Sequence, residues 1–339
     1  MKTKLFLGIA IIAIDCALNI AFAQTNAAMM KAVVVNESGG PEVLKYQDAP
    51  KPEPKDDEIL VRVIAAAVNP VDTYVRKGMF GKRDFPLIIG YDIAGTVEKT
   101  GANAKKFKSG DAVYCYLSVM RGGGYAEFAV AKESETTLKP KNISFQEAAA
   151  VPLAATTAWQ ALIDSAKIDK GQTVLIHGGS GGVGSFAIPI AKSRGAKVVA
   201  TASTAHQSTL KQLGVDQAID YKTAKFEDVV KDVDLVLNCV RADALGRSYG
   251  VVKKGGIIVS ITDEPDQTEC GKRDLHCSRL GAHPDSKVLE ELTKLIEAGK
   301  IKPIVSQTFP LAEAQKAHEQ IETHHTVGKI VLKIAEEKK

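Results

Sequence analysis

Short apolar runs that alternate with glycine fill the first part of the chain. Such runs occur at residues 30–35, 44–48 and 58–68, and later runs cover residues 92–98, 111–115 and 125–130. Runs of this length, bounded by turn residues, predict strands. From residue 145 the pattern changes to a helical stretch and then to alternating strands and helices. The chain is therefore predicted to be an α/β protein with a compact β-rich domain first.

A second apolar pattern begins at residue 173 and surrounds a cluster of glycines. An apolar run at 174–176 precedes the cluster, a helical stretch at 186–194 follows it, and another apolar run covers 197–203. This order is the dinucleotide-binding βαβ unit, and residues 179–184 have its G-x-G-x-x-G spacing. Glycine keeps side chains away from the pyrophosphate, and the helix N-terminus offers free N–H groups. The alternative is an ordinary strand-to-helix turn. The predicted dinucleotide-binding residues are Gly178, Gly179, Ser180, Gly181, Gly182, Val183 and Gly184.

The end of the second strand indicates which dinucleotide is bound. An Asp or Glu at that point holds the ribose 2′-hydroxyl of NAD, but no acidic residue lies between Gly184 and Asp216. The strand ends instead at Ser203, whose hydroxyl can donate a hydrogen bond to a 2′-phosphate. Because no carboxylate repels that phosphate, NADPH is favoured over NADH.

Composition adds mainly exclusions. At 339 residues the chain is long enough for two domains, and 45% hydrophobic with 25% charged residues is ordinary for a globular protein. The net charge of +4 is small for this length. It gives no reason to expect nucleic acid or an anionic membrane as a partner.

Residues 1–23 have the three parts of a secretory signal peptide. Lys2 and Lys4 precede a continuous apolar run at 5–14, and residues 21–23 form an A-x-A cleavage site. The run is too short to span a bilayer, so no membrane association beyond the signal is expected. Cleavage would export the protein to the periplasm or the medium, where NADPH is expected to be scarce. The alternative is a cytoplasmic protein that starts at Met30.

Two cysteines in one loop-like stretch leave two interpretations open. Cys270 and Cys277 can form a disulfide in an exported protein, or they can be free thiols.

Several segments together resemble one known family. They are residues 69–74, 90–95, 123–127, 148–159 and 328–332, in addition to the glycine motif. In these segments the chain is similar to the zinc-independent, zeta-crystallin-like quinone oxidoreductase branch of the medium-chain dehydrogenase/reductase superfamily. The resemblance implies a GroES-like barrel at residues 30–148, completed by 306–339, and a Rossmann domain at 149–305. It also implies a cofactor in the cleft between the domains, and a homodimer.

The same resemblance allows the metal ligands of zinc-dependent relatives to be checked by position. Asn69 stands where those relatives have their first zinc-binding cysteine, and Gly90-Tyr91-Asp92 replaces their Gly-His-Glu triplet. In the loop where they carry four cysteines for a structural zinc, this chain has only Cys115. No metal is therefore expected at either position.

Without a metal, hydrogen-bond donors must stabilise the negative charge that develops on the substrate oxygen. Asn69 and Tyr74 are the candidate donors, and Asp72 is expected to position their loop or to bind a cofactor ribose. The alternative is that Tyr74 packs against the barrel wall and Asp72 caps a turn. Several relatives have a second tyrosine near the position of Phe80, so water is a candidate proton source here.

The remaining cofactor contacts are implied by the resemblance. Thr157 would hold the nicotinamide, and Tyr221 would line the pocket for the adenosine phosphate. His206 occupies a position where relatives carry Lys or Asn, although a surface histidine is often only solvated. Asn238 and Lys329 complete the predicted cofactor-binding residues.

These observations predict an NADPH-dependent, metal-independent oxidoreductase. Hydride would pass to a quinone or to the β-carbon of an activated enone such as a 2-alkenal, with the cofactor carrying the hydride. A dinucleotide-binding sensor or structural protein without turnover is the alternative.

Overall fold

The structure, a computed structural model, describes residues 28–241 and 243–337. The predicted signal peptide lies outside these residues. None of the helices in the described part of the chain is long and apolar enough to cross a bilayer.

The first half of the molecule is built around strand β3 (Glu58–Val68). β3 pairs antiparallel with β5 (Asp92–Thr100), β7 (Phe128–Lys132) and β16 (Lys329–Lys333). The seven-stranded sheet has the order β15-β16-β3-β5-β6-β8, with β7 on β3. Its other strands are β6 (Ala112–Tyr116), β8 (Thr136–Leu138) and β15 (Val305–Pro310). The last strands of the chain therefore lie in the sheet of the first strands.

A small sheet of order β2-β1-β4 lies against this barrel. Its strands are β1 (Met29–Val35), β2 (Leu44–Pro50) and β4 (Leu87–Ile88). β4 and β8 have two and three residues, too few to show a period in the sequence. The strand expected at 125–130 is β7, which begins three residues later at Phe128. Short strands and strand ends are thus where the hydrophobic pattern was least informative.

The second half is a six-stranded sheet of order β11-β10-β9-β12-β13-β14, parallel throughout. Its strands are β9 (Thr173–His177), β10 (Lys197–Ala202), β11 (Gln217–Asp220), β12 (Val233–Asn238), β13 (Val252–Ser260) and β14 (His276–Arg279). Its helices are α4 (Gly184–Ser193), α5 (Gln207–Gln212), α6 (Phe226–Val229), α7 (Ala244–Ser248) and α8 (Gln267–Lys272). This doubly wound sheet beside a mostly antiparallel barrel confirms the expected fold class.

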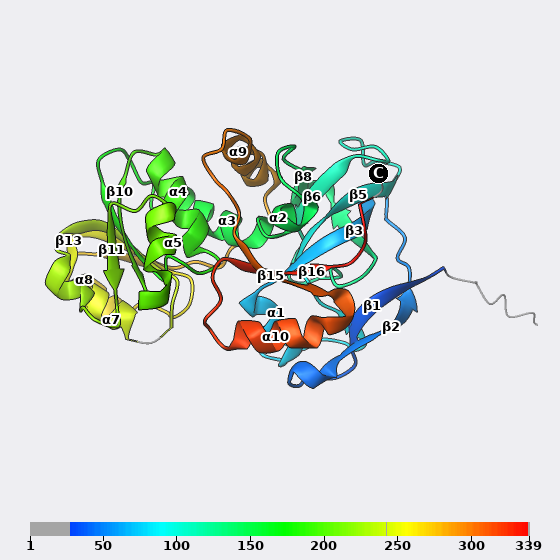
Figure 1. The fold of residues 1–339 in the computed structure, drawn as a ribbon, viewed down its shortest axis with the longest axis horizontal. Helices are drawn as coiled ribbons and strands as arrows, with labels where there is room; N and C mark the ends of the chain where they lie inside the picture. Colours follow the sequence, from blue (N-terminus) through cyan, green and yellow to red (C-terminus); the bar gives the residue numbers. More distant parts are fainter. Residues whose placement is uncertain (1–27, 242, 338–339) are drawn as a thin grey trace, which may run out of the picture.

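Helices join the two halves, which Figure 1 shows at opposite ends of an elongated molecule. α2 (Phe145–Ala149), α3 (Pro152–Trp159) and the π-helical segment Gln160–Ser165 lead from barrel to parallel sheet, and α9 (Ser286–Glu297) returns. Tyr114 of β6 donates a hydrogen bond to the carbonyl of Leu289 in α9 at 2.8 Å. α1 (Pro70–Arg76) and α10 (Ala314–Glu322) cover the barrel side by side. The 3₁₀ segments are Pro41–Val43, Glu133–Glu135, Thr204–His206 and Leu311–Glu313.

Cys270 in α8 and Cys277 in the edge strand β14 are joined by a disulfide, with Cα atoms 6.2 Å apart. Cys270 is buried, whereas Cys277 is half-buried. Of the two interpretations left open by the sequence, the structure has the bridged one. The bridge ties the edge strand of the parallel sheet to the helix before it.

Removing this disulfide is expected to lower the free energy of unfolding by about 2 kcal/mol, because the bridge closes a short loop in the unfolded chain. The measurement is urea unfolding of a Cys270→Ala/Cys277→Ala variant against the oxidised parent protein. Cys239→Ala is the control, since Cys239 is a free cysteine. Equal unfolding midpoints for the parent and the double variant would contradict the prediction.

Candidate active site

The glycine cluster forms the turn between β9 and α4. Gly178 has φ +74°, and the Gly179 amide donates to the carbonyl of Thr201 at 2.9 Å. A β-carbon on Gly184 would overlap the carbonyl oxygen of Gly178, and one on Gly179 would come within 2.8 Å of Ala200. These three glycines are therefore needed by the fold itself, for a turn or for close packing.

Gly181 and Gly182 have a different environment. A β-carbon on Gly181 would meet nothing closer than the Gly178 carbonyl oxygen at 3.4 Å, and one on Gly182 nothing closer than Lys329 Cδ at 3.3 Å. The fold has room for a side chain at Gly181, so folding alone does not explain this glycine. Its bare backbone just before the N-terminus of α4 has the form of a phosphate cradle.

Three of the predicted cofactor residues meet at the carboxyl end of β10 and β11. Ser203 follows β10, and its hydroxyl lies 3.2 Å from Nδ1 of His206. Tyr221 follows β11, where its amide donates to the carbonyl of Ala202 at 3.2 Å and its side chain is 49% exposed. Because Gly179 bonds the neighbouring Thr201, this group lies beside the glycine turn. The structure thus brings together residues that the sequence separates by about forty positions.

Lys222 is a basic residue that the sequence interpretation missed. Its ammonium lies 5.4 Å from the centroid of the Tyr221 ring, at the same exposed corner. Asp220, at the end of β11, accepts a hydrogen bond from the Lys222 amide at 2.9 Å. The signal was available, since Lys222 directly follows a residue already assigned to the phosphate pocket.

The segment expected to be a catalytic loop is the helix α1. Pro70 stands at its first position, and Asp72 Oδ2 accepts a hydrogen bond from the Asn69 amide at 2.6 Å, which makes a capping box. Asp72 is fully buried. The contact matches the alternative in which Asp72 caps a turn, while burial leaves it no path to a cofactor ribose.

Asn69 lies in a buried polar cluster at the end of β3. Its Nδ2 donates to Asp92 Oδ2 at 2.8 Å, and its Oδ1 accepts from the ammonium of Lys329. Lys329 also donates to the Val68 carbonyl at 3.1 Å and lies 3.6 Å from Asp92. Asn69 is only 1% exposed. The expectation of a free amide donor in the cleft is therefore corrected: Asn69 holds the end of β3 to β16.

Lys329 is placed by the pairing of β16 with β3, in which Ile330 faces Val68. Its ammonium is buried and turned toward the barrel. Its aliphatic stem runs under Gly182, and the neighbouring Gly328 amide donates to the carbonyl of Ser180 at 2.8 Å. The structure therefore favours an indirect role for Lys329, in which it supports the glycine turn and does not contact the cofactor itself.

Two carboxyl groups share this buried region with one ammonium. Burial raises the pKa of Asp72 to about 8, against the lowering effect of its hydrogen bond from Asn69, and the charge of Asp92 raises it further. Asp72 Oδ1 has no hydrogen-bond partner among the described residues. Burial also raises the pKa of Asp92 and lowers that of Lys329. Asp72 is thus the carboxyl best placed to hold a proton.

This raised pKa gives a pH-dependent stability. The ordinary Asp pKa of about 3.9 applies to the unfolded chain, so the folded protein holds a proton that the unfolded chain has released. Stability from this group is therefore greatest at low pH and is lost as pH rises from about 4 to about 8. We expect Asp72→Asn to flatten that loss in thermal unfolding measured across this range. Asp57→Asn, an exposed control, should keep the parent slope; parallel curves for Asp72→Asn would contradict the assignment.

Tyr74 is the one predicted catalytic residue whose functional group leaves the barrel. It is half-buried on α1, and its hydroxyl accepts a hydrogen bond from Arg241 Nη2 at 3.0 Å. Arg241 lies on the loop after β12, so the contact joins α1 to the parallel sheet. The alternative in which the Tyr74 ring only lines the barrel wall does not account for this contact. No sequence motif pointed to Arg241.

The other predicted residues contribute to the framework. The Thr157 hydroxyl donates within α3 to the carbonyl of Leu153 at 2.7 Å. Asn238, fully buried at the end of β12, donates to the Val240 carbonyl at 2.9 Å and to the Thr262 hydroxyl at 3.0 Å. Its Oδ1 has no partner in the described chain. Phe80, near the position where several relatives have a second tyrosine, is 43% exposed.

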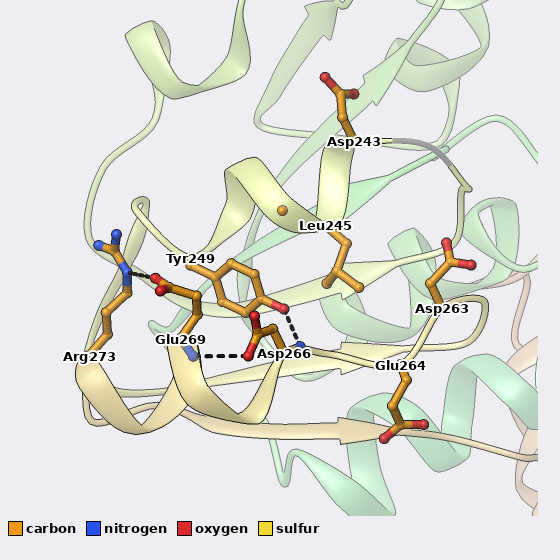
Figure 2. Close-up of a pocket in the computed structure, with 9 residues that line it drawn as sticks. Asp243, Leu245, Tyr249, Asp263, Glu264, Asp266, Glu269 and Arg273 are labelled. Atoms are coloured by element: carbon orange, nitrogen blue, oxygen red, sulfur yellow. Dashed lines mark hydrogen bonds and ion pairs between the residues drawn. The ribbon is translucent and has the colours of Figure 1, made fainter.

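A hollow of about 480 Å³ lies beside α7 and α8, and Figure 2 shows the residues that line it. Asp266 donates its amide proton to the hydroxyl of Tyr249 at 2.7 Å in its wall. Five carboxylates and one guanidinium, that of Arg273, line the hollow, and the carboxylates would repel phosphate. The hollow is therefore not the place for dinucleotide phosphates. The five carboxylates belong to Asp243, Asp263, Glu264, Asp266 and Glu269.

Within residues 28–241 and 243–337, no three His, Cys, Asp or Glu side chains come together as a metal site. Tyr91, at the position of the zinc-binding histidine, is a buried phenol. The absence of zinc stays a prediction from the identity of these residues.

Comparison with known proteins gives two family models and many relatives. Residues 55–141 match the alcohol dehydrogenase GroES-like domain, and residues 213–332 match a zinc-binding dehydrogenase model. The NADPH-dependent alkenal/one oxidoreductase of Arabidopsis thaliana is 39% identical over 89% of this chain and 79% of its own. The quinone oxidoreductase of Homo sapiens is 33% identical over 91% and 99%.

Solved structures agree with these relatives. The quinone oxidoreductase from Coxiella burnetii superimposes with a TM-score of 0.85 at 34% identity, over 91% of this chain and 100% of its own. The Escherichia coli quinone oxidoreductase complexed with NADPH gives 0.81 at 29% identity, over 90% and 99%. The likeness extends over both sheets.

Proposed function

The chain belongs to the quinone oxidoreductase branch of the medium-chain dehydrogenase/reductase superfamily, and we propose that it is an NADPH-dependent reductase of quinones or activated enones. The observation that carries the proposal is the bare backbone at Gly181 and Gly182, before the N-terminus of α4 and beside the end of β10, where no carboxylate stands. Its relatives include enzymes named for both substrate classes, an alkenal/one oxidoreductase and quinone oxidoreductases.

The residues present fit NADPH. Gly181 and Gly182 would receive the pyrophosphate on their bare backbone, and at Gly181 the fold leaves room that a side chain could fill. Ser203, Tyr221 and Lys222 would receive the 2′-phosphate, with His206 held against Ser203. When bound, NADPH supplies the hydride.

Tyr74 is the proposed catalytic residue. Its hydroxyl would donate a hydrogen bond to the substrate oxygen, where negative charge develops as the β-carbon or the quinone ring accepts hydride. Asp72 and Asn69 would hold α1 and the end of β3 in place beneath it. With Phe80 near the position of a second tyrosine, water would deliver the final proton.

We propose that the reaction uses no metal. The positions of the catalytic zinc ligands carry Asn69 and Tyr91, neither of which offers the thiolate or imidazole that zinc requires. Asn69 and Tyr91 both lie outside residues 213–332, so the match to the zinc-binding dehydrogenase family does not include these two positions.

We divide the chain into a barrel domain at 30–148 with 306–339, and a nucleotide domain at 149–305. The pairing of β16 with β3 supports this division. A homodimer is proposed from family membership.

Export is proposed from residues 1–23 and is supported by the disulfide, because bridged cysteines are typical of oxidising compartments. N-terminal sequencing of the cellular protein should begin at Gln24. A start near Met30 would favour the cytoplasmic alternative.

NADPH oxidation tests the function when 2-alkenals and quinones are offered in parallel and NADH is compared with NADPH. We expect turnover with NADPH and little with NADH. If the protein binds NADPH tightly but none of the offered substrates leads to NADPH oxidation, the non-catalytic alternative is supported. A protein that binds neither dinucleotide would contradict the proposal.

A further inference from the structure

We propose that Arg241 is a positioning residue, which reaches from the nucleotide-binding sheet to α1 and turns the phenolic proton of Tyr74 toward the substrate oxygen. The proposal rests on the function proposed above and adds a residue to which no sequence motif pointed.

The direction of one hydrogen bond carries the argument. A guanidinium has five N–H donors and no acceptor, so at 3.0 Å Arg241 Nη2 donates and the oxygen of Tyr74 accepts. A phenol has a single proton, and that proton is not needed for this contact. Among the described residues, no acceptor takes it. It is therefore available to a substrate oxygen, and the charged donor behind it polarises the O–H bond.

The guanidinium is held in place by the two loops that follow β12 and β13. Arg241 Nη1 lies 3.3 Å from Asp263 Oδ1. The preceding carbonyl, of Val240, accepts hydrogen bonds from Asn238 and from Thr262, each at 2.9 Å. Buried polar contacts thus fix the backbone from which an exposed side chain extends.

The same loop contacts the glycine turn. A β-carbon on Gly178 would come within 2.6 Å of Val240 Cγ1, so the two backbones are closely packed. The position of Arg241 is therefore tied to the turn proposed to hold the pyrophosphate.

Tyr74 is fixed equally well from the barrel side. Asp72 caps the start of α1, and near its end the buried Arg76 pairs with Glu322 at 2.6 Å and contacts His318 at 3.0 Å. Two rigid supports thus meet at the contact between Arg241 and Tyr74. The contact sets the direction of the phenol across the boundary between barrel and parallel sheet.

An anion-binding role for Arg241, in recognition of an acidic substrate, is disfavoured by its surroundings. Asp263 offsets its charge, and Asp243, Glu264 and Asp266 line the adjacent hollow. These carboxylates would repel an incoming anion.

A double-mutant cycle tests the proposal with Arg241→Met, Tyr74→Phe and the combined variant. Loss of the Tyr74 donor is expected to lower kcat about 100-fold, as for other donors to a developing oxyanion. Arg241→Met is expected to lower kcat about tenfold with the NADPH Kd unchanged. The combined variant should be no slower than Tyr74→Phe, because Arg241 acts through Tyr74. Arg241→Lys should recover part of the loss, since an ammonium can also donate.

Arg273→Met is the matched control, because it removes an exposed arginine that lines the adjacent hollow and has no contact with Tyr74. It should keep the parent kcat. If the losses in the combined variant multiply, Arg241 acts independently of Tyr74 and the proposal is wrong. It is equally wrong if Arg241→Met only raises KM, and only for enones that carry a carboxylate.

The cycle also separates failure of this inference from failure of the proposed function. If the parent protein turns over no quinone or enone, the proposed function fails. The same four proteins can then be compared by their free energies of unfolding. Additive losses would show that Arg241 and Tyr74 do not interact in solution and would overturn the inference, whereas non-additive losses would support the contact on which it depends.

Discussion

Gly181→Val is expected to weaken NADPH binding at least about 100-fold while the protein stays folded. The β-carbon at this position meets no atom closer than 3.4 Å, and the backbone is not in the left-handed region that favours glycine. The side chain would instead occupy the outer face of the turn, where the pyrophosphate approaches. Loss of about two charge-assisted hydrogen bonds, at about 1.5 kcal/mol each, corresponds to a factor of this size.

The measurement is NADPH affinity by calorimetric titration, with thermal unfolding of the same samples. Gly181→Ala should give an intermediate affinity. The control is Gly246→Ala in α7, where a β-carbon would have no other atom within 4 Å. It tests the effect of adding a side chain elsewhere in the half of the molecule that contains the parallel sheet. Parent-like NADPH affinity in Gly181→Val would show that the phosphates bind elsewhere. A collapse of its unfolding temperature would show that Gly181 serves the fold instead.

The glycine turn could be predicted because its information is local. Strand, turn, helix and second strand fall within about thirty consecutive residues, and each has its own period or composition. Ser203 followed from the same unit, whereas His206 and Tyr221 were implied by the family resemblance. The structure brings the three residues together, because the carboxyl ends of parallel strands meet at one edge of the sheet, and their contact with a cofactor stays a prediction.

The barrel side of the site was predicted less well, because its contacts are long-range. Asn69 and Lys329 are 260 residues apart, and only the pairing of β16 with β3 brings them together. Single-sequence patterns do not contain that pairing; the family resemblance implied it. Asn69 was therefore assigned to the substrate, although its amide is used between Asp92 and Lys329.

Two smaller misses have separate physical causes. The helix α1 has seven residues and starts at Pro70, so it was taken for a loop although Asn69 and Asp72 form a capping box. Arg241 lies in a loop without regular structure, and its role depends on a partner 167 residues away. Side chains that act across the boundary between two domains leave no periodic signal in either.

Lys329→Met is expected to destabilise the protein by about 3 kcal/mol or more. The change removes the only ammonium within reach of Asp92 in the described buried cluster, and Asp92 is fully buried. Removing one partner leaves the other charge without compensation, which costs more than the pair itself contributes. Adding Asp92→Asn should recover much of the loss, because a neutral amide can keep the contact with Asn69.

The measurement is urea unfolding of the parent, both single variants and the double variant at neutral pH, repeated in acid. Because protonation neutralises Asp92, the deficit of Lys329→Met should shrink as pH falls. Lys99→Met is the control, since the ion pair of Lys99 with Glu53 is exposed and should contribute nothing measurable. A deficit in Lys329→Met no larger than in Lys99→Met would mean that the barrel does not depend on this pair. A large deficit that Asp92→Asn relieves would instead show that β16 is joined to β3 by charge as well as by strand pairing, directly beneath the turn where NADPH is proposed to bind.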